Sequence, residues 1–153
     1  MLQRFEQFSS AISSIYHAIQ KLERDEMVKY GLKGPYAQYL VAMSRCPNGI
    51  TATQLSQVCD KDKAAVSRAI MEMERQGLLT RDCSNHTLYR ALLMLTREGE
   101  QAAHYVCEKA KSAVEYAGKG LTDESRALFY TALHQIADNL QTLTHAGLPE
   151  IKE

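Results

Sequence analysis

Apolar side chains recur at helical spacing in long seams toward both ends of the chain. Near the N-terminus, the positions step alternately by three and four residues: Phe5, Phe8, Ile12, Ile15, Ile19 and Leu22. Toward the C-terminus, two further seams follow the same spacing: Ala103, Val106, Ala110, Ala113 and Ala117, then Phe129, Leu133, Ile136, Leu140 and Leu143. This spacing predicts long helices with narrow apolar faces. Such helices need partner helices to cover them.

The middle of the chain carries shorter elements with their own start and stop signals. Pro35 suits the first turn of a helix. Thr51 and Gln54 have capping-box spacing and predict a short helix to about Cys59, with Leu55 and Val58 facing inward. Asp62 is a good N-cap for a further helix, which Gly77 ends.

After Gly77 the pattern changes from helical to extended. Residues 78–81 can form a short strand and residues 88–95 are largely apolar. The two segments flank a turn-like stretch, so they predict a β-hairpin. Two short helices joined by a tight turn and followed by a hairpin make a winged helix-turn-helix. We therefore expect a mainly α fold with a small β-hairpin wing. One domain, 1–153, would hold this core (35–98) between dimerisation arms at 1–31 and 100–147.

The second short helix would enter the major groove of DNA. At 100° per residue, Val66, Ile70 and Met73 face the core. Arg68, on the opposite side, can contact a phosphate or a guanine edge. The predicted DNA-contacting residues are Thr51, Thr53, Lys61, Lys63, Ala64, Ala65, Ser67, Arg68, Arg75, His86 and Arg90. Purely structural roles also remain open, with Thr51 and Thr53 as helix caps and Arg75 as a complement to the helix dipole.

Charge gives this prediction little support. Lysine and arginine total 18 and so do aspartate and glutamate, so the net charge is zero. A basic protein would gain more from counterion release on DNA. What matters is the charge of the face that meets DNA, and there the acidic Glu72 and Glu74 fall at the margins of the helix.

Two further surfaces are predicted on the arms. The expected dimer interface consists of Phe5, Phe8, Ile12, Ile15, Phe129, Leu133, Ile136 and Leu140. A small-ligand pocket between the arms and the core would be lined by Tyr16, His17, Tyr36, Tyr39 and Met43. Ordinary packing of these aromatic residues is the simpler interpretation.

Several function classes are disfavoured. No GxSxG, HExxH or phosphate-binding glycine loop occurs, so we expect no enzyme. The four cysteines lack metal-ligand spacing, so we expect no metal and no cofactor. The start has no apolar signal-peptide core, and no window is apolar enough for a membrane span. We therefore expect a cytoplasmic protein that does not contact membranes.

The stretch 51–99 resembles the core of the multiple-antibiotic-resistance regulator (MarR) family. The segments that carry the resemblance are "TATQLSQ", "KAAVSRAIMEMERQGLL" and "YRALLMLTREG". The resemblance implies a homodimer on a palindromic operator in double-stranded DNA. It also implies repression or activation that a small aromatic or phenolic ligand relieves.

One departure concerns the wing. Many members of that family carry an Asp-x-Arg group at the wing tip, where this chain has Thr87, Leu88 and Tyr89, followed by Arg90. Two alternatives stay open. The neutral charge and the altered wing suggest a winged-helix module that binds protein and not DNA. The cysteines leave open a thiol-based redox regulator of the same fold, although the first helix, where such sensors usually carry their cysteine, has none.

Overall fold

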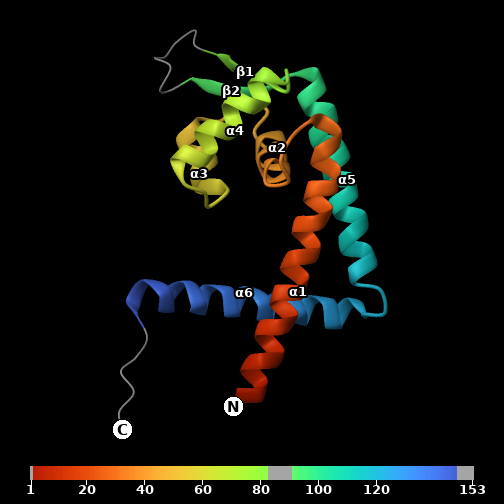
Figure 1. Cartoon of the computed structure of the whole chain (residues 1–153). Coiled ribbons are helices and arrows are strands. Elements are labelled where there is room, and N and C mark those ends of the chain that lie inside the picture. The colour runs from red at the N-terminus through yellow and green to blue at the C-terminus, as the bar shows by residue number, and fades with distance from the viewer. Residues whose placement is uncertain (1, 83–90, 148–153) are drawn as a thin grey trace. The chain divides into compact units, whose positions relative to one another are not determined.

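The computed structural model describes residues 2–82 and 91–147, which fall into two compact units, Met1–Ala110 and Lys111–Glu153. The first unit holds most of the secondary structure (Figure 1). Its elements are α1 (Leu2–Met27), η1 (Val28–Tyr30), α2 (Tyr36–Ser44), α3 (Ala52–Val58), α4 (Lys63–Arg75), β1 (Leu79–Asp82), β2 (Leu92–Leu95) and the first part of α5 (Arg97–Ala117).

Side-chain caps begin the two helices of the helix-turn-helix, as predicted. The Thr51 hydroxyl accepts a hydrogen bond from the Gln54 backbone N–H at 3.2 Å, and the Gln54 side chain accepts from the Thr51 N–H at 2.9 Å. This is a complete capping box. Asp62 caps α4 by accepting from the Ala65 N–H at 2.8 Å. Each cap satisfies a backbone donor that the first turn of a helix leaves unpaired.

The turn between α3 and α4 is braced by backbone and side-chain hydrogen bonds. Asp60 adopts a left-handed conformation with φ of 49°. The Asp60 N–H then donates to the Gln57 carbonyl, and the Lys61 N–H donates to the Ser56 carbonyl. This pair of bonds is the Schellman arrangement. The Ser56 hydroxyl donates to the Lys61 carbonyl at 2.6 Å, so the turn holds α4 in a defined position beside α3.

The predicted hairpin is present in its described part. Strand β1 pairs antiparallel with β2, with Leu79 opposite Leu95 and Asp82 opposite Leu92. Ile50 adds a single bridge to Leu93 on the other edge. Leu79 and Leu93 face the core while Thr80 and Met94 are exposed, which is the alternation of a one-sided sheet.

One hydrophobic core joins these elements. Every element from the end of α1 to the first half of α5 contributes to it. Its largest fully buried side chains are Met27, Leu40, Leu55, Val66, Ile70, Met73, Leu79 and Leu93. The core therefore fixes α4 and the hairpin on one scaffold, because both place apolar side chains in it.

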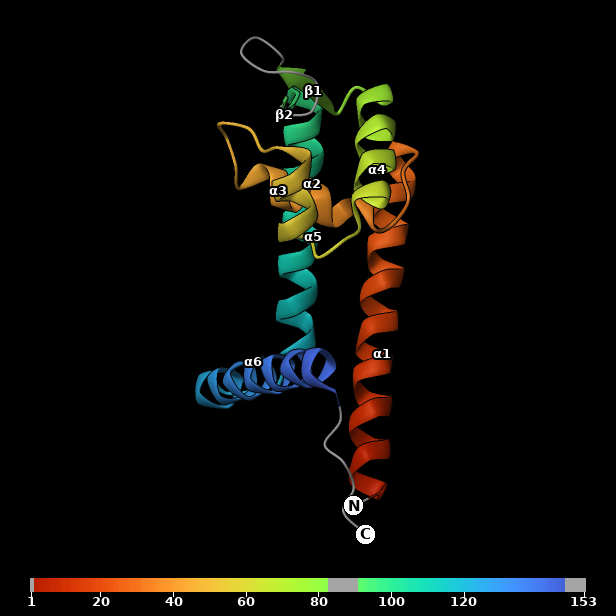
Figure 2. The ribbon, with the colours of Figure 1, turned by 90° about the vertical axis from the view of Figure 1, so that its left-hand side faces the viewer.

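Helix α1 contributes to this core only at its C-terminal end. Met27 is fully buried, and the Lys29 ammonium of η1 donates to the Tyr105 hydroxyl of α5 at 2.8 Å. The N-terminal half of α1 projects beyond α2, α3 and α4 (Figure 2). Its apolar seam is exposed at Phe5, Phe8, Ile12, Ile15, Ile19 and Leu22.

The second unit consists of the end of α5, a short turn, and α6 (Asp123–Ala146). Thr122 caps α6 by accepting from the Ser125 N–H at 3.2 Å. The turn is held by the Arg126 guanidinium, which donates to the Gly118 carbonyl at 3.2 Å. The seam of α6 is exposed at Phe129, Ile136 and Leu140 and half-buried at Leu133.

The predicted fold class is confirmed: the protein is mainly helical with a two-stranded hairpin after a helix-turn-helix. The prediction that Val58 faces inward was wrong. Val58 is 64% exposed because α3 ends there, and the left-handed turn that follows carries the chain away to α4. Within residues 2–82 and 91–147, no helix is both long and apolar enough to span a membrane.

Candidate nucleic-acid interface

Helix α4 presents two chemically different sides. Val66, Ala69, Ile70 and Met73 are buried in the core. The opposite side, here called the outer face of α4, consists of Ala64, Ser67, Arg68, Met71 and Arg75, and all five side chains are exposed. The predicted placement of Val66, Ile70 and Met73 in the core and of Arg68 on the opposite side is therefore correct. An exposed helix face of this kind is what a major groove can admit.

Three cations lie at or near the start of α4 without a carboxylate partner in the described ranges. Lys61, Lys63 and Arg68 are exposed, and no ion pair involves them within residues 2–82 and 91–147. Asp62 lies between the two lysines and its carboxylate caps the helix. The start of α4 thus presents positive charge together with backbone N–H groups, which favours a phosphate.

The C-terminal half of α4 differs, because its arginine is already paired. The Arg75 guanidinium contacts both carboxylate oxygens of Glu72, at 2.6 and 3.3 Å. This contact holds the pKa of Glu72 below its usual range. In β1, Arg81 pairs similarly with Glu74 at 3.0 Å. Sequence reasoning missed both pairs, although the three-residue spacing of Glu72 and Arg75 could have revealed the first.

The threonines and Ala65 occupy different settings. The Thr51 hydroxyl is engaged in the capping box, where it also donates to the Gln54 side chain at 2.8 Å. Thr53 is exposed in the first turn of α3, and Ala65 is half-buried at the edge of the outer face. The structure therefore leaves Thr53 accessible to a phosphate, while Thr51 has a structural role. His86 and Arg90 lie outside the described residues.

Tyr39 of α2 packs beneath the helix-turn-helix. It is buried, and this burial raises the pKa of its phenol. Cys59 lies nearby with its thiol 3.9 Å from the Gln38 carbonyl oxygen, and burial raises the pKa of this thiol too. A raised pKa keeps Cys59 protonated and less nucleophilic. The thiol-sensor alternative is therefore weak at this cysteine.

The residues predicted to line a ligand pocket lie on two different helices, α1 and α2. Tyr16 and His17 are exposed on α1 and contact each other, with ring centroids 6.2 Å apart. Tyr36 and Tyr39 form another ring pair on α2, 6.0 Å apart, and Met43 belongs to the core. In the described ranges, no ring contact joins the α1 pair to the α2 pair.

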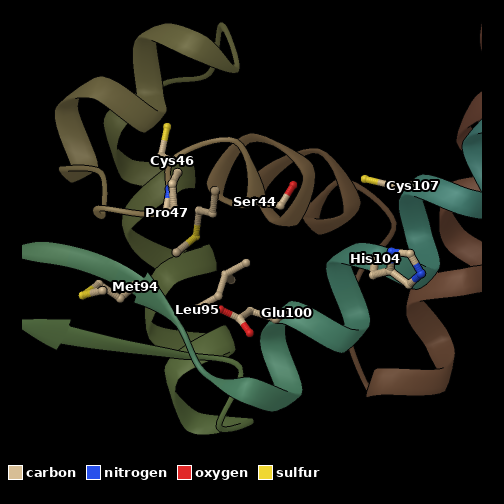
Figure 3. A pocket seen from close by; sticks show the side chains of 9 residues that line it. Ser44, Cys46, Pro47, Met94, Leu95, Glu100, His104 and Cys107 are labelled. Atoms are coloured by element: carbon tan, nitrogen blue, oxygen red, sulfur yellow. The ribbon is translucent and has the colours of Figure 1, made fainter.

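A cavity of about 320 Å³ lies instead between the end of α2, strand β2 and α5 (Figure 3). Of the predicted pocket residues, only Met43 lines it. The other lining residues are Ser44, Cys46, Pro47, Met94, Leu95, Glu100, His104 and Cys107. The spacing of Glu100, His104 and Cys107 by four and three residues places them on one face of α5, and this spacing could have identified them in the sequence.

Residues 30–86 match the family model described as the MarR family. No curated protein sequence matches the chain significantly. Many solved structures share its fold. One is a MarR-family transcriptional regulator from Listeria monocytogenes complexed with a 26mer DNA. It is 23% identical with a TM-score of 0.76, and the alignment covers 94% of this chain and 97% of that one.

Two further structures extend the comparison. A MarR transcriptional regulator from Methanosarcina mazei Go1 is 22% identical with a TM-score of 0.76, covering 90% of this chain and 92% of that one. MepR, a regulator of the Staphylococcus aureus multidrug efflux pump MepA, is 15% identical with a TM-score of 0.66, covering 87% and 98%. These TM-scores and coverages show a shared fold along almost the whole chain.

Proposed function

We propose that this chain, whose central segment belongs to the MarR family, is a dimeric transcription regulator that reads a palindromic operator with α4. The observation that carries the proposal is the outer face of α4, which lies opposite the core and whose five side chains are exposed. Arg68 on this face, with Lys61 and Lys63 at the start of the helix, supplies positive charge although the net charge of the protein is zero. A solved relative of the same fold is complexed with DNA, which supports the same partner here.

Arg68 is the principal candidate for a base contact. It is exposed in the second turn of α4, and within residues 2–82 and 91–147 no carboxylate pairs with it. An arginine in this position can contact the O6 and N7 atoms of guanine with two hydrogen bonds. Lys61 and Lys63 suit phosphates, because an ammonium group acts as a point charge without sequence preference.

The experiment that tests this function is selection of bound duplexes from a random DNA pool at moderate salt. An enriched palindrome with half-sites about one helical turn apart is expected of a dimeric reader. Arg68→Ala should then weaken binding by about 1–3 kcal/mol and relax specificity at one base pair of each half-site. Arg97→Ala removes an equal charge from an exposed site at the start of α5, and it should leave specificity unchanged.

We propose that the exposed seams of α1 and α6 form the dimer interface. Large apolar side chains repeat along each helix on the surface of a single chain, and an exposed apolar face of this kind marks an association site. Ile12→Glu in α1 and Ile136→Glu in α6 should each lower the mass measured by light scattering toward that of one chain. Neither outcome depends on DNA binding, so the dimer is tested separately.

We propose that a small ligand modulates binding from the cavity between α2, β2 and α5. This cavity combines apolar walls with one carboxylate and one imidazole, as small-molecule sites do. An aromatic or phenolic compound such as salicylate is the probe. It should raise the melting temperature of the wild type, and Leu95→Arg, which fills the cavity with a charge, should abolish that rise.

The ion pairs of Arg75 and Arg81 favour a second candidate function, the binding of another protein. Because Arg75 and Arg81 are neutralised by Glu72 and Glu74, the free positive charge is small for a DNA-binding protein. A winged-helix module that binds another protein would have such a surface. The salt dependence of binding to a random duplex separates the two functions, since phosphate contacts give a steep slope and their absence a flat one.

A further inference from the structure

The outer face of α4 carries one large apolar side chain that does not pack in the hydrophobic core. Met71 is 55% exposed in the middle of the helix. Two residues later, Met73 is fully buried among core side chains, so the same helix uses methionine for packing on its other side. Met71 lies nearly opposite Met73 and Val66, at 100° per residue. Its exposure is therefore a property of the surface that faces outward.

The two arginines beside Met71 on the outer face differ in whether a carboxylate already pairs with them. Arg68 precedes it by three residues and is a neighbour on the same helix surface. Arg75 follows by four residues, but Glu72 holds its guanidinium. Ala64 lies seven residues before Met71 and is also exposed. The outer face therefore alternates between apolar and cationic positions, with Arg68 between Ala64 and Met71.

These residues are close enough along the helix to reach neighbouring base pairs. Arg68 and Met71 are about 4.5 Å apart along the helix axis, and the whole span from Ala64 to Met71 is about 10.5 Å, or about three base-pair steps of B-form DNA. In the major groove, the only apolar group on a base edge is the 5-methyl of thymine. A methionine side chain is long and flexible enough to cover such a methyl group. Burying the two groups against each other removes apolar surface of both from water.

We infer that Met71 is a specificity-determining residue that contacts the 5-methyl group of a thymine, within three base pairs of the base pair that Arg68 reads. The inference rests on the proposed DNA-reading function and adds a recognised chemical group to it. The expected half-site therefore contains a guanine and a thymine at this separation.

The experiment uses the operator recovered by duplex selection. Each thymine is replaced in turn by deoxyuridine, symmetrically in both half-sites, which removes only the 5-methyl group. Binding of the full-length protein is measured by fluorescence anisotropy. For the wild type, one thymine should prove sensitive, with affinity falling about fifteenfold when both half-sites lack the methyl group, which is about fourfold for each half-site.

Variants assign that sensitivity to Met71. Met71→Ala should bind the thymine operator about as weakly as the wild type binds the uracil operator, and it should no longer distinguish the two. Met71→Leu keeps an apolar side chain and should retain part of the discrimination. Val28→Ala is the matched control, because Val28 is an exposed apolar residue of η1 that belongs neither to the outer face of α4 nor to the cavity. It should leave the uracil effect unchanged.

Two results would overturn the inference while leaving the proposed function intact. One is an operator whose thymines all tolerate uracil, and the other is Met71→Ala with the uracil sensitivity of the wild type. Circular dichroism confirms that each variant is folded. If no duplex is enriched and binding shows no salt dependence, the proposed function fails and the inference fails with it. In that case, Met71 would belong to a surface that binds protein.

Discussion

Gly99 of α5 lies directly against the backbone of Leu78, so closely that a β-carbon on Gly99 would sit 1.8 Å from the Leu78 carbonyl oxygen. This carbonyl also accepts a hydrogen bond from the Thr96 N–H at 3.1 Å. The start of α5 is therefore packed onto the segment that connects α4 to β1. Because that segment joins α4 to the hairpin, the Gly99 contact helps to fix the positions of α4 and the hairpin.

Gly99→Ala should lower the free energy of unfolding by about 2–3 kcal/mol, because the clashing atom is backbone and cannot rotate away. Helix propensity alone would favour alanine here by about 1 kcal/mol, so the sign of the change is diagnostic. Urea denaturation measures it. Gln101→Ala, at an exposed position of the same helix, should change stability by less than about 0.5 kcal/mol. An unchanged midpoint for Gly99→Ala would refute the close contact.

Thr96 is expected to stabilise the same junction through its hydroxyl. The hydroxyl donates to the Gly77 carbonyl at 2.6 Å and accepts from the Gly99 N–H at 3.0 Å. Thr96→Val keeps the shape but loses both hydrogen bonds, and it should cost about 1–2 kcal/mol by thermal or urea unfolding. Thr96→Ser retains the hydroxyl and should recover most of that loss. Equal stabilities of the two variants would show that the hydroxyl contributes nothing.

Asp60 should be replaceable by glycine with a gain in stability. The φ of Asp60 is 49°, in the left-handed region of backbone conformation. A residue with a β-carbon is sterically strained there, whereas glycine is not. Asp60→Gly should raise the free energy of unfolding by about 0.5–1 kcal/mol. Asp60→Ala, which keeps the β-carbon but loses the polar side chain, should lower it. A loss of stability in the glycine variant would mean that the aspartate side chain stabilises the turn.

Glu72→Gln should strengthen DNA binding if α4 meets DNA. The substitution releases the Arg75 guanidinium and removes a negative charge beside the outer face. We expect affinity to rise on the order of threefold to tenfold at low salt, and the salt slope to steepen by about one unit as one more phosphate is neutralised. Glu98→Gln removes an equal charge from the start of α5 and should have little effect. A weaker complex for Glu72→Gln would show that Glu72 holds Arg75 in its binding position.

Acid should weaken the contact between the end of α1 and α5. Hydrogen bonding to Lys29 holds the pKa of Glu26 below its usual 4.5, and the Tyr105 hydroxyl acts in the same direction. A lowered folded-state pKa means that this stabilisation is complete above the unfolded-state pKa. It is lost as the pH falls through the folded value.

The effect is small and sensitive to salt, because the Lys29 side chain is half-exposed. Lys29→Met should raise the Glu26 pKa toward 4.5 in an NMR titration. It should also flatten the pH dependence of stability below pH 5. An unchanged Glu26 titration in that variant would show that Lys29 is not the cause of the shift.

Whether a feature of this protein could be predicted from its sequence depends on how far apart in the chain the interacting residues lie. The sequence by itself determined the helices, their caps and the side of α4 that faces the core. Those features depend on residues within about four positions of each other, as Thr51 with Gln54 and Asp62 with Ala65 illustrate. The family resemblance was readable for the same reason, because its segments are contiguous.

The tertiary structure decided the contacts between distant residues. Gly99 meets Leu78, Arg81 meets Glu74 across the turn into β1, and the cavity collects side chains from α2, β2 and α5. It also decided that Val58 is exposed, since the left-handed turn at Asp60 sets where α3 leaves the core. Periodicity reports which side of a helix is apolar, but only packing selects the neighbour that a side chain meets.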